Sequence, residues 1–324
     1  MTTFRRLTVH VSASGEVHRS IEEVPLHDLP ANDLLIKVSY SSLNYKDALS
    51  ANGHKGISRF YPHTPGIDAA GVVVRSGSKL FREGDRVIVT GYDLGMNTKG
   101  GFSEFISVPA EWALPLPAKM QLKEAMMLGT AGLTAAMCID KLRPSGLTDL
   151  PVIISGATGG VGSVALLILK KMGIETVAFS RRREAVPYLA SLGAKGVIHE
   201  WEDSPKPLLK GQYSGGIDTV GGHALENMLK HIRQEGALAL CGMAASSDFT
   251  TTVFPFILRG ITLYGVGSAE SSLEWKKTLW EKLAGEWKPD GLPDITRTVS
   301  LEGLEAEIQQ MLAGKAQGRV VLAL

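Results

Sequence analysis

A glycine-dense turn, SGATGGVG at residues 155–162, constrains the fold of this chain more than any other feature. The apolar run 152–154 precedes it, and the apolar run 164–169 follows it. This pattern predicts a buried strand, a tight turn and the start of a helix. In such a turn, free backbone N–H groups and the positive end of the helix dipole converge on an anion. The expected anion is the pyrophosphate of a dinucleotide.

The turn departs from the G-x-G-x-x-G pattern at one position. Ala157 stands at the first glycine position, and Gly159 and Gly162 keep the other two. Because a lone glycine pattern also suits a loop that only packs tightly, the motif by itself leaves a phosphate site and a structural turn open.

The next apolar strand pattern, 176–179, ends on the run Ser180-Arg181-Arg182-Arg183. This run lies roughly twenty residues past the glycines, where NAD sites usually carry an Asp or Glu that accepts the ribose 2′-OH. A carboxylate would repel a 2′-phosphate, whereas a hydroxyl beside guanidinium groups binds it by charge-assisted hydrogen bonds. We therefore predict NADPH as the cofactor, held by Ser180 and Arg182, with Arg181 as a further candidate. The alternative for one or two of these arginines is a solvated run that opens a helix.

The second half of the chain alternates strand and helix patterns. The strand patterns lie at 196–198, 216–220, 237–241 and 261–264, with helix patterns such as 224–233 between them. Buried strands that alternate with helices predict an α/β, doubly wound parallel sheet. Its ligand is expected at the carboxyl ends of the strands, where Gly242 and Gly265 allow close approach.

The first part of the chain has an all-β pattern of short strands broken by turns. These strand patterns lie at 34–38, 71–74, 86–89 and 105–108, and two more follow near the chain end at 295–299 and 319–322. We expect the chain end to complete the first domain. The expected boundaries are a β-rich domain over 1–124, a cofactor domain over 125–270 and a C-terminal return over 271–324.

Composition excludes several classes of protein. The chain has 34 Lys and Arg against 33 Asp and Glu, a net charge of +1, and this balance argues against the concentrated basic surface of a nucleic-acid-binding protein. No apolar run approaches the roughly 20 residues of a membrane span. The start, MTTFRRLTVH, lacks the apolar core of a signal peptide. We expect a cytoplasmic protein without nucleic-acid or membrane partners.

The motifs together resemble the medium-chain dehydrogenase/reductase family over nearly the whole chain. More narrowly, the chain resembles the YhdH/YhfP group of quinone oxidoreductase-like proteins, which includes NADPH-dependent acrylyl-CoA reductases. The broad resemblance is carried by PGIDAAGVV (65–73), EGDRVIV (83–89), GGFSEF (100–105), LGTAGLTAA (128–136) and GATGGVGSVA (156–165), and the narrow one by LNYKD (43–47), VTGYDLGMNTKGGFSEF (89–105) and TVFPFILRGITLYG (252–265). The resemblance implies a GroES-like β-barrel domain joined to a Rossmann domain.

The resemblance also predicts a metal-free enzyme. Zinc-dependent relatives use a Cys and a His-Glu pair as catalytic ligands and a four-cysteine lobe for a structural zinc. Here Asn44 lies near the place of the first ligand, Ile67-Asp68 replace the pair, and no cysteine occurs between Gly84 and Gly101. Zinc needs several N or S ligands at fixed spacing. The two cysteines of the chain, Cys138 and Cys241, instead fit small core residues.

Without zinc, reduction of a C=C bond conjugated with a carbonyl is favoured, because donors near the carbonyl oxygen can stabilise the enolate. We predict an NADPH-dependent reductase of a short 2-enoyl-CoA such as acrylyl-CoA. An NADPH:quinone oxidoreductase is the alternative of the same class, and a non-catalytic NADPH-binding redox sensor or structural protein is the alternative of another class. Relatives commonly dimerise through the edge of the Rossmann sheet, so we expect a homodimer.

The site residues follow from the motifs and the resemblance. Asn44 and Tyr45 are the expected catalytic residues, with Asn44 as a donor to the carbonyl and Tyr45 as the proton donor; Tyr92 and bulk water remain open as proton sources. Asn44 could instead only cap a turn, and Arg319 could be a surface charge. The expected cofactor residues are Asn44, Thr130, Thr134, Ala157, Thr158, Gly159, Gly160, Val161, Ser180, Arg181, Arg182, Gly242, Gly265 and Arg319.

Overall fold

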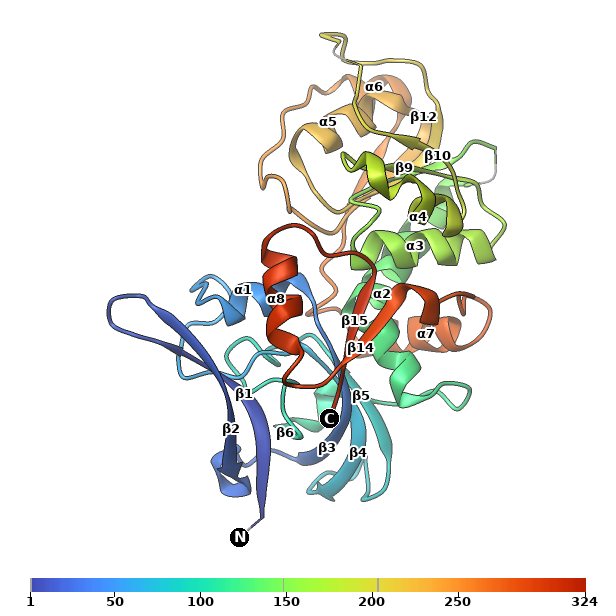
Figure 1. The fold of residues 1–324 in the computed structure, drawn as a ribbon. Helices are drawn as coiled ribbons and strands as arrows, with labels where there is room; N and C mark the ends of the chain where they lie inside the picture. Colours follow the sequence, from blue (N-terminus) through green and yellow to red (C-terminus); the bar gives the residue numbers. More distant parts are fainter. Residues whose placement is uncertain (1, 148, 203) are drawn as a thin grey trace. The chain divides into compact units, whose positions relative to one another are not determined.

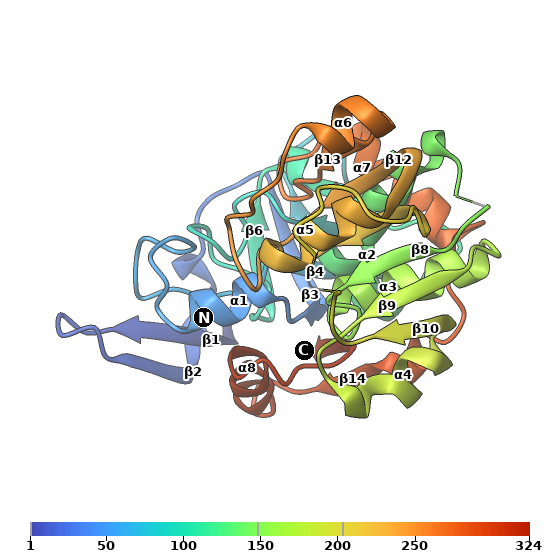
Figure 2. The same ribbon diagram turned by 90° about the horizontal axis from the view of Figure 1, so that it is seen from above.

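The computed structural model describes residues 2–147, 149–202 and 204–324. The chain divides into two compact units, which Figures 1 and 2 show from two directions. The first unit comprises Met1–Thr130, Ala269–Ala284 and Pro293–Leu324, and the second comprises Ala131–Ser268 and Gly285–Leu292. Both chain ends thus belong to the first unit. The division differs from the expected boundaries at 125–130 and 269–270, which belong to the first unit, and at 285–292, which belong to the second.

The first unit is built on a seven-stranded sheet in the order β14-β15-β3-β4-β5-β7, with β6 also paired to β3. The C-terminal strand β15 pairs antiparallel with β3, so the chain end completes this sheet. The strands are β3 (Leu34–Ser42), β4 (Asp68–Ser76), β5 (Arg86–Thr90), β6 (Phe105–Val108), β7 (Ala113–Pro115), β14 (Thr296–Val299) and β15 (Arg319–Ala323), and the helices of this unit are α1 (Tyr45–Ala51), α7 (Leu273–Ala284) and α8 (Leu304–Leu312).

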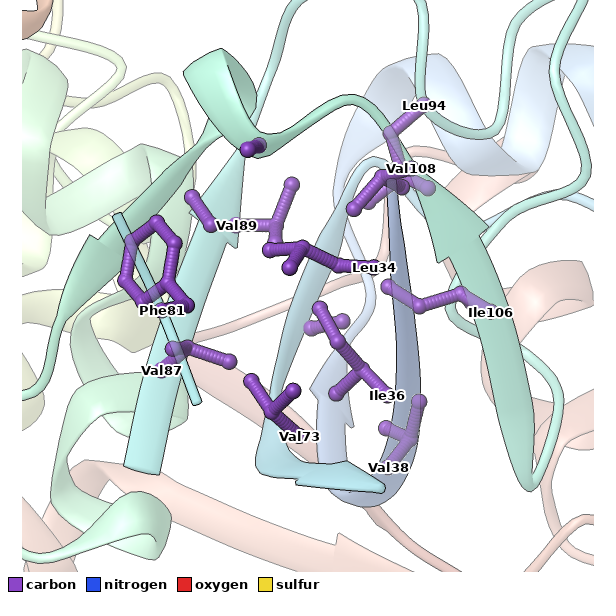
Figure 3. Close-up of a cluster of buried hydrophobic side chains, with 13 residues drawn as sticks. Leu34, Ile36, Val38, Val73, Phe81, Val87, Val89, Leu94, Ile106 and Val108 are labelled. Carbon is purple, nitrogen blue, oxygen red and sulfur yellow. The ribbon is translucent and has the colours of Figure 1, made fainter. Parts of the chain in front are cut away.

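Alternating apolar residues fill the core of this sheet. Leu34, Ile36 and Val38 lie two residues apart on β3, so their side chains point to one face. Figure 3 shows them in one apolar cluster with Val87 of β5 and Ile106 of β6, and all five are at most 2% exposed. The period-two pattern in the sequence therefore corresponds to one buried face of the sheet.

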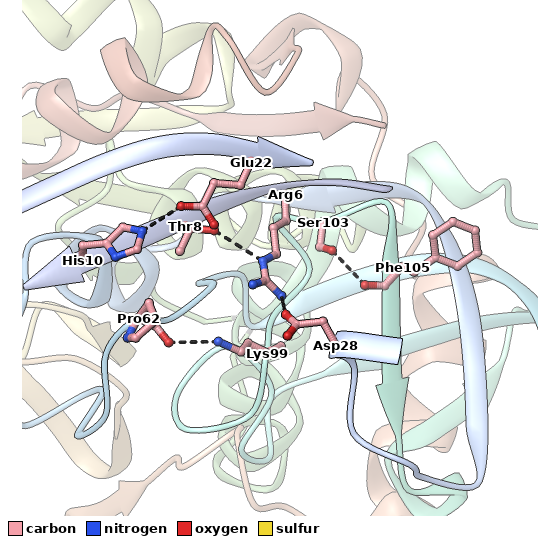
Figure 4. Close-up of polar contacts among 9 residues, drawn as sticks. All are labelled: Arg6, Thr8, His10, Glu22, Asp28, Pro62, Lys99, Ser103 and Phe105. Carbon is pink, nitrogen blue, oxygen red and sulfur yellow. Dashed lines mark hydrogen bonds and ion pairs between the residues drawn. The ribbon is translucent and has the colours of Figure 1, made fainter. Parts of the chain in front are cut away.

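A separate hairpin of β1 (Thr3–Val11) and β2 (Val17–Pro25) is fixed by polar contacts. Figure 4 shows Arg6 at its centre, with an ion pair to Asp28 at 2.5 Å and a hydrogen bond from its Nε to the Thr8 hydroxyl at 3.3 Å. Nearby, the Lys99 ammonium donates to the carbonyl of Pro62 at 2.9 Å. Burial and the charge of Arg6 lower the pKa of Lys99.

The second unit is a six-stranded, fully parallel sheet in the order β10-β9-β8-β11-β12-β13. From β8 the chain adds β9 and β10 on one side. It then returns to form β11 on the other side of β8 and adds β12 and β13 beyond it. Because crossovers between parallel strands share one handedness, the two directions place helices on opposite faces of the sheet. This arrangement confirms the predicted doubly wound sheet. The elements are β8 (Val152–Ser155), α3 (Gly160–Lys171), β9 (Thr176–Phe179), α4 (Val186–Ser191), β10 (Ala194–Ile198), β11 (Tyr213–Asp218), α5 (Gly222–His231), β12 (Ile232–Leu240), α6 (Phe254–Arg259) and β13 (Thr262–Gly265).

Helix α2 (Leu122–Leu142) contains a kink at Gly129, whose φ is 53°, and the boundary between the units follows Thr130. Contrary to the expectation that no apolar run approaches a membrane span, the segment Leu122–Ser145 is long and apolar enough to span a membrane by length and composition. However, 78% of its most apolar window is buried inside the protein. Burial to this extent is typical of a core helix.

Candidate functional site

The glycine turn of the second unit has the geometry of a phosphate site. Gly156 has a φ of 57°, and Gly159 is the N-cap of α3. A Cβ on Gly162 would lie 2.6 Å from the Cα of Ala157, so only glycine lets the helix pack this closely against the turn. The first turn of α3 begins with Gly160 and Val161. Among the described residues, no side chain caps this helix, and no acidic residue lies in its first turn. These features fit an anion bound by backbone N–H groups.

A buried carboxylate anchors this turn to the neighbouring strand. The Ser155 hydroxyl donates to Asp218 at 2.5 Å, and the backbone N–H of Gly221 donates to the other oxygen of Asp218 at 2.8 Å. Burial raises the pKa of Asp218. These bonds tie the carboxyl ends of β8 and β11 together at the point where the strand order reverses, which is where doubly wound sheets bind their ligands.

The turn and the serine-arginine run meet in space. The Arg182 guanidinium donates to the Thr158 hydroxyl, and its backbone N–H donates to the Ser180 hydroxyl at 3.2 Å. Arg181 is exposed, and Arg183 forms a surface ion pair with Glu200 at 3.0 Å. The structure therefore brings Ser180, Arg182 and Thr158 together, while no contact places Arg181 with them among the described residues.

The remaining predicted residues of this unit lie at other strand and helix positions. The Thr134 hydroxyl donates to the Ser268 hydroxyl at 2.7 Å. A Cβ on Gly242 would lie 2.3 Å from the carbonyl oxygen of Thr219, so this position requires glycine for close packing. Gly265 has open space around its Cα. A contact that the sequence did not suggest joins the Tyr188 hydroxyl to Ser163 at 2.9 Å.

The first unit contains a second constellation, which we call the buried polar cluster. Its side chains come from positions far apart in the chain, and one of its two carboxylates is Asp68, at the start of β4. Asp68 accepts from the Ser42 hydroxyl at 2.6 Å and from the Asn44 amide at 2.8 Å. It also accepts from the Thr130 backbone N–H at 2.8 Å and hydroxyl at 2.5 Å. The cluster comprises Ser42, Asn44, Asp47, Asp68, Thr130 and Arg319.

Asp47 is the second carboxylate of the cluster and is fully buried. It accepts from the backbone N–H groups of Asn44 at 2.7 Å and Ile67 at 2.8 Å. Burial, and then the charge of Asp68, raise the pKa of Asp47 to about 7, although these hydrogen bonds oppose the rise. The cluster therefore holds one carboxyl group that changes its protonation state near neutral pH.

Arg319 supplies the cation of the cluster. It lies at the start of β15, is 2% exposed, and donates from Nε to the carbonyl of Met127 at 2.9 Å. Its Nη1 donates to the Asn44 side-chain oxygen at 3.3 Å, whereas its buried Nη2 has no hydrogen-bond partner among the described residues. Burial lowers the pKa of this guanidinium. A buried donor without a partner is costly, so Nη2 is the donor in this cluster that a ligand oxygen would satisfy.

The kink in α2 makes room for the cluster. A Cβ on Gly129 would lie 2.5 Å from the carboxylate of Asp68, 2.5 Å from the Ser42 hydroxyl and 2.9 Å from Nη2 of Arg319. Because its φ is also positive, this position is restricted to glycine on both steric and backbone grounds.

The cluster corrects several expectations for the first unit. Asn44 caps α1 and directs its amide hydrogens at the carboxylates of Asp68 and Asp47, so this amide is engaged within the cluster and is not a free donor to a carbonyl. Thr130, expected at the cofactor, is bonded to Asp68. Arg319 is buried and so is not a surface charge. Tyr45 is 51% exposed, and its hydroxyl has no hydrogen bond to any described residue.

Sequence reasoning missed the two carboxylates as site residues. Asp47 lies three residues after Asn44, the spacing of a capping box, and Asp68 interrupts an apolar segment at the start of a strand. Either signal could have pointed to a buried carboxylate. Within the described part of the chain, no three or more His, Cys, Asp or Glu side chains are grouped so that they could hold a metal ion.

Comparison with known protein families shows which family the chain belongs to. Residues 30–118 match the alcohol dehydrogenase GroES-like domain, and residues 160–285 match the family described as zinc-binding dehydrogenase. YhfP of Bacillus subtilis, which is provisionally named a quinone oxidoreductase, is 41% identical over 100% of this chain and 99% of its own length. The chain belongs to the medium-chain dehydrogenase/reductase family. The predicted pair of a GroES-like domain and a Rossmann domain is thereby confirmed.

Other members of this family are similar to the chain over almost its entire length. The acrylyl-CoA reductase AcuI of Ruegeria pomeroyi is 37% identical over 95% of both proteins. The yhdH oxidoreductase of Salmonella enterica, solved in complex with NADP, superposes with a TM-score of 0.95 at 35% identity and 99% coverage of both chains. YhfP, solved with NAD bound, superposes with a TM-score of 0.96 over 100% of both chains.

Proposed function

We propose that this protein is an NADPH-dependent reductase that delivers a hydride to the C=C bond of a conjugated carbonyl, with a short 2-enoyl-CoA such as acrylyl-CoA as its substrate. The observation that carries this proposal is the buried, unpartnered Nη2 of Arg319. Hydride addition to a conjugated acceptor moves negative charge onto the carbonyl oxygen, and a buried cationic donor stabilises that charge. The resemblance to AcuI supports the choice of acyl-CoA.

The cofactor residues fit a nicotinamide dinucleotide phosphate. The glycine turn has no acidic neighbour in the first turn of α3, and Gly162 occupies a place that a Cβ would fill. Backbone N–H groups at 156–161 would hold the pyrophosphate, and Ser180 with Arg182 would hold the 2′-phosphate. When bound, NADPH supplies the hydride. A metal-free reaction remains part of this proposal.

The cluster would act on the acceptor through its charges. Arg319 Nη2 would bind the carbonyl oxygen, while the Asn44 side-chain oxygen orients the guanidinium and the charges of Asp68 and Asp47 favour its charged form. Tyr45 remains our proposal for the proton donor to the α-carbon, because this half-exposed residue directly follows Asn44 at the start of α1. Solvent water is the competing source of that proton.

The test is turnover of NADPH by the purified protein, followed by its absorbance. The acceptors to compare are acrylyl-CoA, 1,4-benzoquinone and an unconjugated aldehyde. We expect NADPH oxidation with acrylyl-CoA. The Arg319→Met variant should lose roughly 100- to 1,000-fold in kcat/KM, the usual effect of removing an oxyanion donor. Arg297→Met, on the neighbouring strand β14, is the matched control because Arg297 forms a surface ion pair with Glu307 at 2.8 Å.

A quinone reductase is the second candidate, favoured by the 41% identity to YhfP. Turnover of benzoquinone with no turnover of acrylyl-CoA would replace the first proposal by this one. If no conjugated acceptor is reduced, both are wrong, and a non-catalytic NADPH-binding protein becomes the better account.

We also propose that the protein is a homodimer formed through the second unit. Strand β13 is the last strand of the sheet, and the segment before it exposes large apolar side chains. Val253 is 62% exposed, Ile257 73% and Leu258 59%. An open strand edge beside such a patch is typical of an interface between copies. Light scattering should give twice the chain mass for the wild type and the chain mass for Ile257→Glu.

A further inference from the structure

A buried lysine outside the cluster holds three segments of the first unit together. Lys276, on α7, is 1% exposed, and its ammonium donates to the carbonyls of Thr90 at 2.9 Å and Ala269 at 2.8 Å. The same ammonium lies 3.5 Å from the centre of the Tyr92 ring. Lysine is rarely buried unless its charge is compensated, and here two carbonyls and an aromatic face compensate it.

The ring above this ammonium belongs to a residue in an unusual conformation. Tyr92 has a φ of 52°, which is a genuine outlier for a bulky side chain. Its ring stacks on Trp112 with centroids 5.8 Å apart and planes at 11°, and its backbone N–H donates to Ala269 at 2.9 Å. Such strain persists only where surrounding contacts enforce it, and it collects at functional sites.

The hydroxyl of Tyr92 has weaker contacts than the ring that carries it. The ring is half-buried, and within the described part of the chain the hydroxyl makes only a long contact of 3.5 Å to the carbonyl of Ser271. Burial, and then the charge of Glu111, raise the pKa of Tyr92, so the phenol stays protonated and remains a hydrogen-bond donor.

The register of the sheet places this arrangement next to the buried polar cluster. Thr90, which accepts from Lys276, is the cross-strand partner of Asp68 in the antiparallel pairing of β5 with β4. Burial lowers the pKa of Lys276 to about 8, and the charge of Asp68 opposes this shift. Lys276 and Tyr92 thus adjoin the strand position that carries the central carboxylate of the cluster.

We propose that Lys276 is a positioning residue for the reductase reaction and acts through Tyr92, whose strained turn it fixes so that the phenol hydroxyl donates a hydrogen bond to the conjugated acceptor. This inference rests on the proposed function, because it assumes that the cluster around Asp68 and Arg319 receives the acceptor. It assigns no proton transfer to Tyr92. Lys276 itself stays bonded to Thr90 and Ala269 throughout.

The experiment compares kcat, KM and NADPH affinity in four variants, using acrylyl-CoA and 1,4-benzoquinone as acceptors. Lys276→Met should lower kcat/KM roughly 10- to 100-fold, since small misplacement of a contacting group has effects of this size. Lys276→Arg keeps a cation and should recover most of that loss. Tyr92→Phe keeps the ring and removes the hydroxyl, and should lower kcat/KM by a similar factor. Lys277→Met is the matched control, because Lys277 is the exposed neighbour on the same helix.

The decisive result is the double variant Lys276→Met with Tyr92→Phe. If Lys276 acts through the hydroxyl, the double variant is no slower than Lys276→Met alone, and NADPH affinity is unchanged in every variant. Additive losses, or no recovery in Lys276→Arg, would overturn the inference. If Lys276→Met does not fold, Tyr92→Phe decides by itself, and wild-type rates in that variant would overturn the inference. Absence of turnover by the wild type would instead reject the proposed function and, with it, this inference.

Discussion

The two units carry their chemical groups in different ways. In the second unit the candidate cofactor site is made largely of backbone, from a glycine turn and the start of α3 that lie within one short stretch of sequence. In the first unit the buried polar cluster is made of side chains from β3, α1, β4, α2 and β15, up to 277 residues apart between Ser42 and Arg319. A site of the first kind can be found from a local motif. A site of the second kind exists only after the chain end has joined the sheet.

The largest effect should come from the glycine that makes room for the cluster. Gly129→Ala would place a Cβ 2.5 Å from both Asp68 and Ser42 at a positive φ, so we expect a loss of unfolding free energy. Clashes of this kind in a packed core cost on the order of 3 kcal/mol or more. Urea denaturation measures the loss. Gly314→Ala is the control, since Gly314 has a φ of 69° and open space for a Cβ. Equal losses in both variants would show that backbone strain alone, and not the cluster, restricts position 129.

A smaller effect is expected in the second unit, where one side chain contributes to cofactor choice. Arg182→Ala should weaken NADPH binding by roughly 10- to 100-fold, the loss expected from one charge-assisted hydrogen bond of about 1.5–3 kcal/mol. Affinity for NADH should not change, because NADH lacks the 2′-phosphate. Fluorescence titration of both nucleotides makes the comparison. Arg183→Ala, at the exposed ion pair with Glu200, should leave both affinities unchanged. Equal losses for NADPH and NADH would contradict the phosphate assignment.

The third effect concerns pH and is the smallest within any single pH unit. Because the pKa of Asp47 is raised to about 7 in the folded protein, the native state keeps a proton that the unfolded chain releases at lower pH. The stabilising contribution of the protonated carboxyl is full below the unfolded pKa and is lost as pH rises toward 7. Asp47→Asn should therefore remove a downward slope of up to about 1.4 kcal/mol per pH unit between roughly pH 4 and 7. Urea midpoints of both proteins across this range measure it, and parallel curves would mean that Asp47 is ionised throughout.

The sequence predicts the parts that depend on local pattern. The strand, glycine turn and helix at 152–171, and the meeting of Ser180 with Arg182, follow from spacing and from the chemistry of phosphate binding. Resemblance added the two domain types. Helix and strand ends were less accurate: β12 begins at Ile232, five residues before the apolar pattern at 237, because Ile232 pairs with Tyr213 of β11 ahead of an irregularity in the register.

The sequence does not predict the buried polar cluster, because burial of Asp47, Asp68 and Arg319 depends on contacts between distant segments. Arg319 sits in an apolar C-terminal run where a surface position is equally consistent with the pattern. The sequence identifies Asn44 as a site residue. Its hydrogen bonds to Asp47 and Asp68 depend on how the folded chain places the two carboxylates, which residue spacing in the sequence does not show. Lys276 likewise looks like an ordinary polar residue of an amphipathic helix.

The central claim is that the second unit holds the cofactor and that Arg319 in the first unit activates the acceptor. Its most direct test is to measure NADPH affinity and acceptor turnover separately in Arg319→Met. The account predicts an NADPH dissociation constant equal to that of the wild type and a loss in kcat/KM of roughly 100-fold or more. Unchanged turnover, or a loss of NADPH affinity that accounts for the whole loss of turnover, would contradict it.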